Sequence, residues 1–209
     1  MQQLWQNLKT QTLESLLLLY IFLLPWSTVF IFNEKLINGL QWEPATGVIY
    51  LTEILLWLIF LIFVIKSSKN FSLKKLNLKN LDKNITIITL TVWFLIFGSG
   101  LSIIYAGEKL AVFYLWLKLL QAGALLFIIA TSKLKFHQAG LTLALSAGLQ
   151  GLLATFQFLT QTISGNKYLG LITHRAQDIG ALVLEAEGGR WLRAYGSFND
   201  PNFLGGFLA

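Results

Sequence analysis

The chain alternates between long apolar blocks and shorter polar connections. A block of about twenty apolar residues is long enough to cross the hydrocarbon core of a bilayer as a helix. Five blocks are complete, and a sixth begins at Phe203 and reaches Ala209. The predicted helices cover residues 13–32, 48–65, 85–105, 110–130, 140–163 and 203–209. The pattern predicts an all-α integral membrane protein, with residues 1–209 as one polytopic membrane domain that is the N-terminal part of a longer chain.

The composition fits this class of protein. The chain is 55% hydrophobic and 12% charged, whereas soluble domains are about one quarter charged. The first apolar block is longer than the core of a cleavable signal peptide and no small-residue cleavage site follows it, so we expect it to remain as a helix. The absence of cysteine excludes disulfides and thiolate chemistry within this sequence. The two histidines, His137 and His174, are expected on opposite sides of the membrane, so no metal site is expected.

The basic residues predict the orientation of the helices. The net charge is +6, but the lysines gather in alternate connections, which is typical of membrane topology rather than of nucleic-acid binding. Cytoplasmic connections of membrane proteins are enriched in lysine and arginine. The N-terminus is therefore expected in the cytoplasm. The lysines that carry this inference are Lys9, Lys66, Lys69, Lys74, Lys75, Lys79, Lys83, Lys133 and Lys135.

The connection 164–202 is the longest polar stretch and is expected outside the cytoplasm. Residues 181–186 and 190–195 flank Gly188 and Gly189, a pattern that predicts a β-hairpin with a tight glycine turn. Binding and catalytic residues often lie on loops that a rigid scaffold supports. We therefore expect a functional site in this connection.

Lys118 lies near the middle of the fourth predicted helix, where an unpaired ammonium is unfavourable. Glu53 of the second helix lies at a comparable depth, because both helices are expected to run inward. Two interpretations stay open. Lys118 forms a structural ion pair with Glu53, or it lines a pocket for an anionic ligand.

Two other features within the predicted helices concern packing. Gln150, Gln157 and Gln161 share one face of the fifth helix and predict interhelical hydrogen bonds, while its small residues predict close helix contacts. These small residues are Ala144, Ala147, Gly148 and Gly151. Pro25 is expected to kink the first helix, and the stretch 98–100 is expected to distort the third.

The segment 193–206, Arg-Ala-Tyr-Gly-Ser-Phe-Asn-Asp-Pro-Asn-Phe-Leu-Gly-Gly, predicts a helix start at the outer interface. Asp200 suits the N-cap and Pro201 the first helical position. Free N–H groups at a helix start favour phosphate, and Arg193 offers a permanently charged, bidentate contact. A capped helix with an interfacial anchoring arginine would account for the same residues.

This segment resembles the signature R-x-x-G-[ST]-F-x-x-P-N-x-x-G-G of the O-antigen ligase-like membrane protein family, which includes O-antigen ligases, O-antigen polymerases and related protein O-glycosyltransferases. The resemblance implies an enzyme of the bacterial inner membrane that transfers a glycan from undecaprenyl diphosphate to an acceptor hydroxyl on the outer face. The acceptor is a glycan, a lipid or a protein. Neither a metal nor a cofactor is expected if arginines supply the positive charge. The acceptor's identity and the catalytic base do not follow from these residues.

The resemblance assigns roles only to residues that match the motif. It implies that Arg193 binds the diphosphate, that Asn202 is a polar contact and that three glycines permit close approach, namely Gly196, Gly205 and Gly206. Family members often carry His, Asn or Asp at the position of Asp200, so no proton transfer is assigned to it. The weaker candidates match no motif position: Lys118, Arg175 and Arg190. His174 lies in the same connection and is expected to be an ordinary surface residue.

A second class of function stays open. In a transporter or flippase-like protein for an anionic or lipid-linked substrate, Lys118 and the glutamines of the fifth helix would line a substrate path. The ligase interpretation instead places the chemistry in the connection 164–202.

Overall fold

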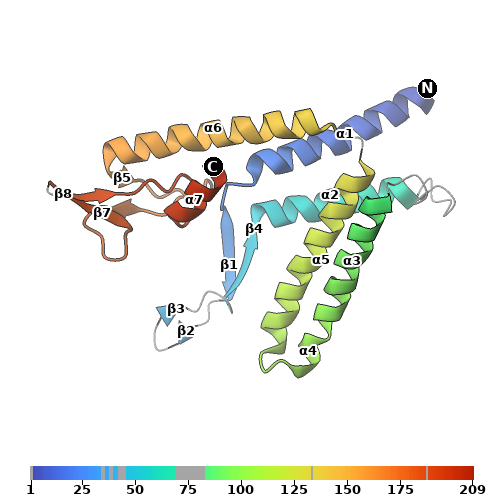
Figure 1. Cartoon of the computed structure of the whole chain (residues 1–209), viewed down its shortest axis with the longest axis horizontal. Helices are drawn as coiled ribbons and strands as arrows, with labels where there is room; N and C mark the ends of the chain where they lie inside the picture. The colour runs from blue at the N-terminus through green and yellow to red at the C-terminus, as the bar shows by residue number, and fades with distance from the viewer. Residues whose placement is uncertain are drawn as a thin grey trace. The chain divides into compact units, whose positions relative to one another are not determined.

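The computed structural model describes residues 2–33, 36–37, 40–41, 46–68, 83–132, 134–186 and 188–209, and it is mostly helical (Figure 1). The helices are α1 (Gln2–Leu23), α2 (Leu51–Ser68), α3 (Lys83–Gly100), α4 (Ser102–Tyr105), α5 (Lys109–Thr131), α6 (Phe136–Thr160) and α7 (Pro201–Leu208). The strands are β1 (Val29–Asn33), β2 (Leu36–Ile37), β3 (Leu40–Gln41), β4 (Gly47–Tyr50), β5 (Thr162–Ile163), β6 (His174–Arg175), β7 (Val183–Ala186) and β8 (Gly189–Leu192). The strands form two-stranded sheets in the pairs β1–β4, β2–β3, β5–β6 and β7–β8.

Within the described residues, three helical segments are long and apolar enough to cross a membrane: Ile87–Tyr105, Lys109–Thr131 and Phe136–Thr160. Two apolar helical segments are shorter, Thr12–Leu23 and Leu51–Ile65. The predicted count of five spans is therefore not supported, although all five apolar blocks contain helix. Most of the lysine-rich connection from which the orientation was predicted, residues 69–82, lies outside the described residues.

The first helix differs from the prediction at both ends. It begins at Gln2 rather than at residue 13, and it ends at Leu23 rather than at residue 32. Pro25 terminates this helix instead of kinking it, because proline lacks an N–H and disfavours helical geometry in the preceding residue. The β-branched and aromatic residues of Val29–Asn33 then form strand β1.

The third predicted helix is interrupted, as expected, after its Gly-Ser-Gly stretch. Helix α3 ends at Gly100 and α4 begins at Ser102. A Cβ atom at Gly100 would lie 2.9 Å from Nε1 of Trp116 on α5, and that Nε1 donates a 2.8 Å hydrogen bond to the Ile96 carbonyl. The absent side chain at Gly100 therefore lets α5 pack closely on α3.

The chain divides into two compact units. Unit 1 contains residues Met1–Leu16, Ile31–Ile49 and Glu53–Leu134, and unit 2 contains Leu17–Phe30, Tyr50–Thr52 and Lys135–Ala209. In unit 1, α5 packs against α3 and also contacts α2 through the edge-on rings of Phe63 and Phe127. In unit 2, α6 lies alongside the connection 164–202 and the start of α7 (Figure 1).

Strand β5 and the connection 164–202 share a small apolar core. Its buried members are Ile163, Ala176, Ala181, Leu192 and Tyr195. The predicted hairpin is confirmed: β7 pairs antiparallel with β8, from Val183 opposite Leu192 to Ala186 opposite Gly189. Tyr195 fixes the base of the hairpin, because its hydroxyl accepts a 2.8 Å hydrogen bond from the Leu182 N–H.

Candidate functional site

Helix α7 begins as the sequence predicts. Asp200 is the N-cap, and its carboxylate accepts a 2.7 Å hydrogen bond from the Asn202 N–H. Pro201 occupies the first turn and is buried. The cap satisfies one of the free N–H groups that a helix start presents.

Arg193 and Asn202, both predicted as diphosphate contacts, lie together in unit 2. Arg193 follows strand β8, and its backbone N–H donates to the Leu182 carbonyl at 3.1 Å. Its Nη2 donates a 3.0 Å hydrogen bond to Oδ1 of Asn202. Among the described residues no carboxylate pairs with this guanidinium. Arginine has five N–H donors, so a half-buried cation with unused donors stands beside the start of α7.

The glutamine face of α6, formed by Gln150, Gln157 and Gln161, bonds to the backbone of residues 192–197. Gln161 Oε1 accepts from the Leu192 N–H at 2.6 Å, and Gln150 Oε1 accepts from the Ser197 N–H at 2.9 Å. Gln150 and Gln157 share a face of α6 as predicted, whereas Gln161 lies just past the end of the helix. Their partner is an irregular segment of chain rather than another helix.

Gln157 makes the largest set of these bonds. Its Oε1 accepts from the N–H groups of Tyr195 at 3.0 Å and Gly196 at 2.8 Å. Its Nε2 donates to the Gly196 carbonyl at 2.7 Å. Gln150 and Gln157 are 1% and 3% exposed, so their amide groups are committed to this backbone.

The small residues of α6 do not show the predicted close contacts. A Cβ atom added at Gly148 or Gly151 would meet no atom within 4 Å, and Ala144 is exposed. Within the described residues, hydrogen bonds from the glutamines hold the segment 192–197 on this helix. Contacts of the small residues do not.

Of the three motif glycines, Gly196 is the one that the fold itself requires. Its φ is +60°, and a Cβ atom there would lie 2.7 Å from Oε1 of Gln150 and 2.9 Å from Cδ1 of Leu204. At Gly205 and Gly206 a Cβ atom would meet nothing within 4 Å. The neighbours in unit 2 therefore explain Gly196, while Gly205 and Gly206 leave open space beside the first turns of α7.

We expect Gly196→Ala to lower the free energy of unfolding by about 1–3 kcal/mol, because alanine is strained at positive φ and its methyl group would crowd Gln150. Gly205→Ala should change it by less than about 0.5 kcal/mol. Thermal unfolding of the purified protein in detergent would measure both variants. Equal stability of Gly196→Ala and the unchanged protein would contradict this packing.

The weaker candidates in the connection 164–202 have structural partners. Arg190 is exposed and lies 3.8 Å from the Glu185 carboxylate, its cross-strand neighbour. Arg175 is exposed, and its backbone N–H bonds to Asp178. The His174 ring stacks on Tyr195 with 4.6 Å between ring centroids. The structure brings together Arg193 and Asn202 and not these three residues.

Lys118 lies in unit 1 and forms the predicted ion pair. Its Nζ lies 2.9 Å from Oε1 of Glu53 and 4.7 Å from the ring centroid of Tyr114. The two charged side chains are 30% and 18% exposed. The predicted Glu53–Lys118 ion pair is therefore present, and it balances the charge of Lys118 inside the unit.

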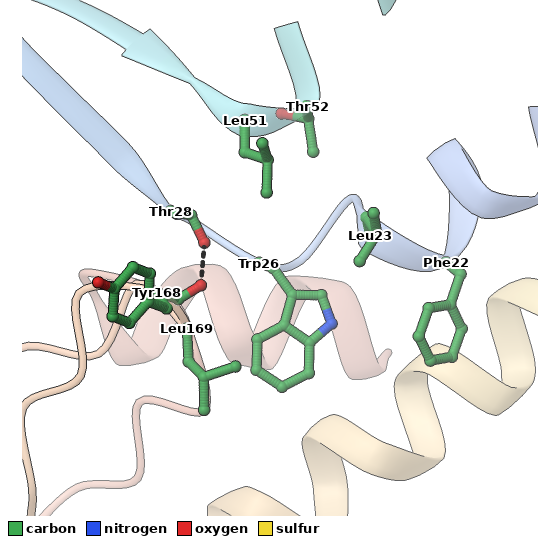
Figure 2. Close-up of a pocket in the computed structure, with 8 residues that line it drawn as sticks. All are labelled: Phe22, Leu23, Trp26, Thr28, Leu51, Thr52, Tyr168 and Leu169. Carbon is green, nitrogen blue, oxygen red and sulfur yellow. Dashed lines mark hydrogen bonds between the residues drawn. The ribbon is translucent and has the colours of Figure 1, made fainter. Parts of the chain in front are cut away.

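A largely apolar pocket of about 250 Å³ lies in unit 2. Figure 2 shows the indole of Trp26 in its middle, between Leu169 and Phe22, with Leu51 and Thr52 at the start of α2 on the other side. The remaining lining residues are Leu23, Thr28 and Tyr168. Thr28 Oγ1 donates a 2.8 Å hydrogen bond to the Tyr168 carbonyl, which ties the loop to the chain after α1.

Ser27 and Ser197 connect this pocket to the motif, a link that sequence reasoning missed. Ser27 Oγ bonds to the Ser197 carbonyl and lies 3.4 Å from Oδ1 of Asn199. Ser197 Oγ donates a 2.6 Å hydrogen bond to the Pro25 carbonyl. Pro25 was the available signal, since a helix that stops there exposes carbonyls and brings Ser27 out of the helix.

The described residues contain no group of three or more His, Asp or Glu side chains that could hold a metal ion. Comparisons with family models, with curated proteins and with solved structures found no significant match for this chain. The candidate site is therefore characterised by its own geometry: an arginine with unused donors, a capped helix start and an apolar pocket. Two lining residues of this pocket, Trp26 and Thr28, flank Ser27, which bonds to Ser197 of the motif segment 193–206.

Proposed function

We propose that the protein is a membrane-embedded glycan ligase or polymerase of the bacterial inner membrane. It transfers a glycan from undecaprenyl diphosphate to an acceptor hydroxyl on the outer face, in the biosynthesis of a surface polysaccharide. The observation that carries this proposal is the pairing of Arg193 with Asn202 at the capped start of α7, within a segment that resembles the O-antigen ligase-like signature. Arg193 would contact the diphosphate through its unused N–H donors.

The apolar pocket supports a lipid-linked donor. Its lining comes from the end of α1, the start of α2 and the loop at Tyr168, and Trp26 and Thr28 flank Ser27, which bonds to Ser197 of the motif segment. Tryptophan and tyrosine are enriched where membrane proteins meet the headgroup layer. An isoprenoid chain in this pocket would therefore continue toward a diphosphate near the motif segment.

The reaction would need electrostatic stabilisation more than proton transfer. The acceptor oxygen forms a bond to the anomeric carbon of the glycan, and the bond between that carbon and the diphosphate oxygen breaks. The diphosphate leaves with the bonding electron pair, and the acceptor hydroxyl releases its proton. A guanidinium and helix N–H groups beside the leaving oxygen would stabilise the charge that develops there.

Glycan transfer in membranes tests this proposal. Membranes that contain the protein, a labelled polyprenyl-diphosphate-linked glycan and an acceptor should yield labelled acceptor and free polyprenyl diphosphate. Movement of intact lipid-linked glycan across the membrane, without cleavage from the diphosphate, would favour the transporter instead. Two observations favour the ligase: Gln150 and Gln157 are buried with their amides bonded to backbone, and Lys118 is paired with Glu53.

The proposed orientation makes a topological prediction. The chain has no cysteine, so Ser68→Cys and Ser164→Cys each introduce a single reporter. In intact cells a membrane-impermeant thiol reagent should label the cysteine at position 164. It should label the cysteine at position 68 only after the membrane is permeabilised. Labelling of position 68 in intact cells would reverse the proposed orientation.

A further inference from the structure

The glutamines of α6 bond to the motif segment at several points along the helix, and not only at the end of the helix. Gln161 follows the last residue of α6, Thr160, and bonds to Leu192. One turn back, Gln157 bonds to Tyr195 and Gly196. Gln150 bonds to Ser197 and lies ten positions before Thr160, which is about 15 Å along a helix axis. The chain from Leu192 to Ser197 thus runs beside the last ten residues of a membrane-length helix.

Irregular backbone that is buried needs hydrogen-bond partners within the protein, because its N–H groups have no access to water. Arg193, Ala194 and Tyr195 belong to no helix or strand. The backbone N–H groups of Tyr195 and Gly196 donate to Gln157, and that of Ser197 donates to Gln150. Both glutamines are buried. Ser197 is fully buried, and its hydroxyl bonds to Pro25. The segment is therefore held from two sides within unit 2.

We propose that Gln157 is the positioning residue of the diphosphate site: it holds the backbone of Tyr195 and Gly196 against α6, and so sets where Arg193 and Asn202 meet. This inference rests on the proposed function, since the site that it positions is the proposed diphosphate site. Gln157 itself touches no substrate. Its effect on the site is indirect. Tyr195 and Gly196 lie in the chain between Arg193, at the hairpin, and Asn202, at the start of α7, so holding their backbone sets where these two side chains meet.

The Gln157→Glu variant turns this positioning into a pH-dependent property. A protonated carboxyl keeps both functions of the amide, since it accepts from the N–H groups of Tyr195 and Gly196 and donates to the Gly196 carbonyl. An ionised carboxylate cannot donate and repels that carbonyl. Transfer by Gln157→Glu, relative to the unchanged protein at the same pH, should fall at least about tenfold as pH rises from about 5 to about 9.

Dividing the activity of Gln157→Glu by that of the unchanged protein at each pH cancels the pH effects that both proteins share. His174, whose ring stacks on Tyr195, is present in both proteins, so its effect cancels in this ratio. The matched control is Gln138→Glu, an exposed glutamine on the same helix, whose relative activity should not change with pH. A relative activity of Gln157→Glu that stays near one at every pH would overturn the proposal. An equally steep fall of the relative activity in Gln138→Glu would also overturn it.

Amide hydrogen exchange tests the clamp without reference to transfer. In the unchanged protein the amides of Tyr195, Gly196 and Ser197 should be protected although they lie outside helices and strands. In Gln157→Leu the amides of Tyr195 and Gly196 should exchange at least about tenfold faster, and in Gln138→Leu they should not. Unchanged protection in Gln157→Leu would overturn the inference. If the unchanged protein transfers no glycan, the proposed function fails, and the exchange result alone decides whether Gln157 holds the segment.

Discussion

Glycan transfer should fall by about 30- to 100-fold in Arg193→Lys, although the positive charge is kept. A guanidinium presents a planar set of donors that matches phosphate oxygens in a bidentate way, whereas an ammonium is a compact point charge. Lysine is also expected to lose the 3.0 Å bond to Asn202 that orients the side chain. Loss of about 2–3 kcal/mol of transition-state stabilisation corresponds to this range. Transfer in membranes with matched protein amounts would measure it.

Arg190→Lys is the matched control for this substitution. Arg190 stands three positions earlier, is exposed, and pairs across the hairpin with Glu185 at 3.8 Å. An exposed pair of this kind contributes little to stability, so transfer should stay within about twofold of the unchanged protein. Equal activity of Arg193→Lys and Arg190→Lys would make Arg193 an interfacial anchor instead of a diphosphate ligand.

Removal of one partner of the Glu53–Lys118 pair should lower the free energy of unfolding by about 2–3 kcal/mol. Either Lys118→Met or Glu53→Gln leaves a charge inside unit 1 without its 2.9 Å partner, and an uncompensated buried charge is strongly destabilising. The double variant leaves no charge, so it should be more stable than either single variant. Unfolding in detergent would measure all three variants.

The double variant separates the two interpretations of Lys118. A structural pair predicts that the two effects are not additive, because the second substitution relieves the first. If transfer instead falls equally in Lys118→Met and in the double variant, while both proteins stay as stable as the unchanged protein, Lys118 contacts a ligand and the structural interpretation is wrong.

Local patterns predicted much of this fold from the sequence. Apolar blocks predicted the helices, Gly188 and Gly189 predicted the hairpin, and Asp200 with Pro201 predicted the start of α7. The Glu53–Lys118 pair was predictable because two helices expected to run in the same direction, with a fixed rise per residue, place these charges at comparable depths. Each of these features depends on neighbouring residues or on simple helix geometry.

Features that depend on distant partners were not predictable in this way. The spacing of Gln150 and Gln157 predicted a shared face, but nothing in that spacing specifies that the partner is the backbone of Tyr195 to Ser197, about forty positions later. Pro25 was expected to kink a helix because the apolar block continues beyond it. The structure ends the helix there, and the Pro25 carbonyl bonds to Ser197.

The position of the motif segment along α6 is the difference with the largest consequence for the site. The sequence places it after the fifth apolar block, which predicts a position beyond the end of that helix. The structure lays Leu192 to Ser197 back along α6, held by buried glutamines. Polar residues in an apolar helix identified the face, but only the fold identifies what that face binds.

Direct binding of the carrier lipid tests whether Arg193 and the start of α7 form a diphosphate site. Native mass spectrometry of the purified protein with undecaprenyl diphosphate and undecaprenyl monophosphate at equal concentration would measure it. A diphosphate site should bind the diphosphate at least about tenfold more tightly than the monophosphate, with that preference lost in Arg193→Lys and kept in Arg190→Lys. Equal binding of the two lipids, or an unchanged preference in Arg193→Lys, would contradict it.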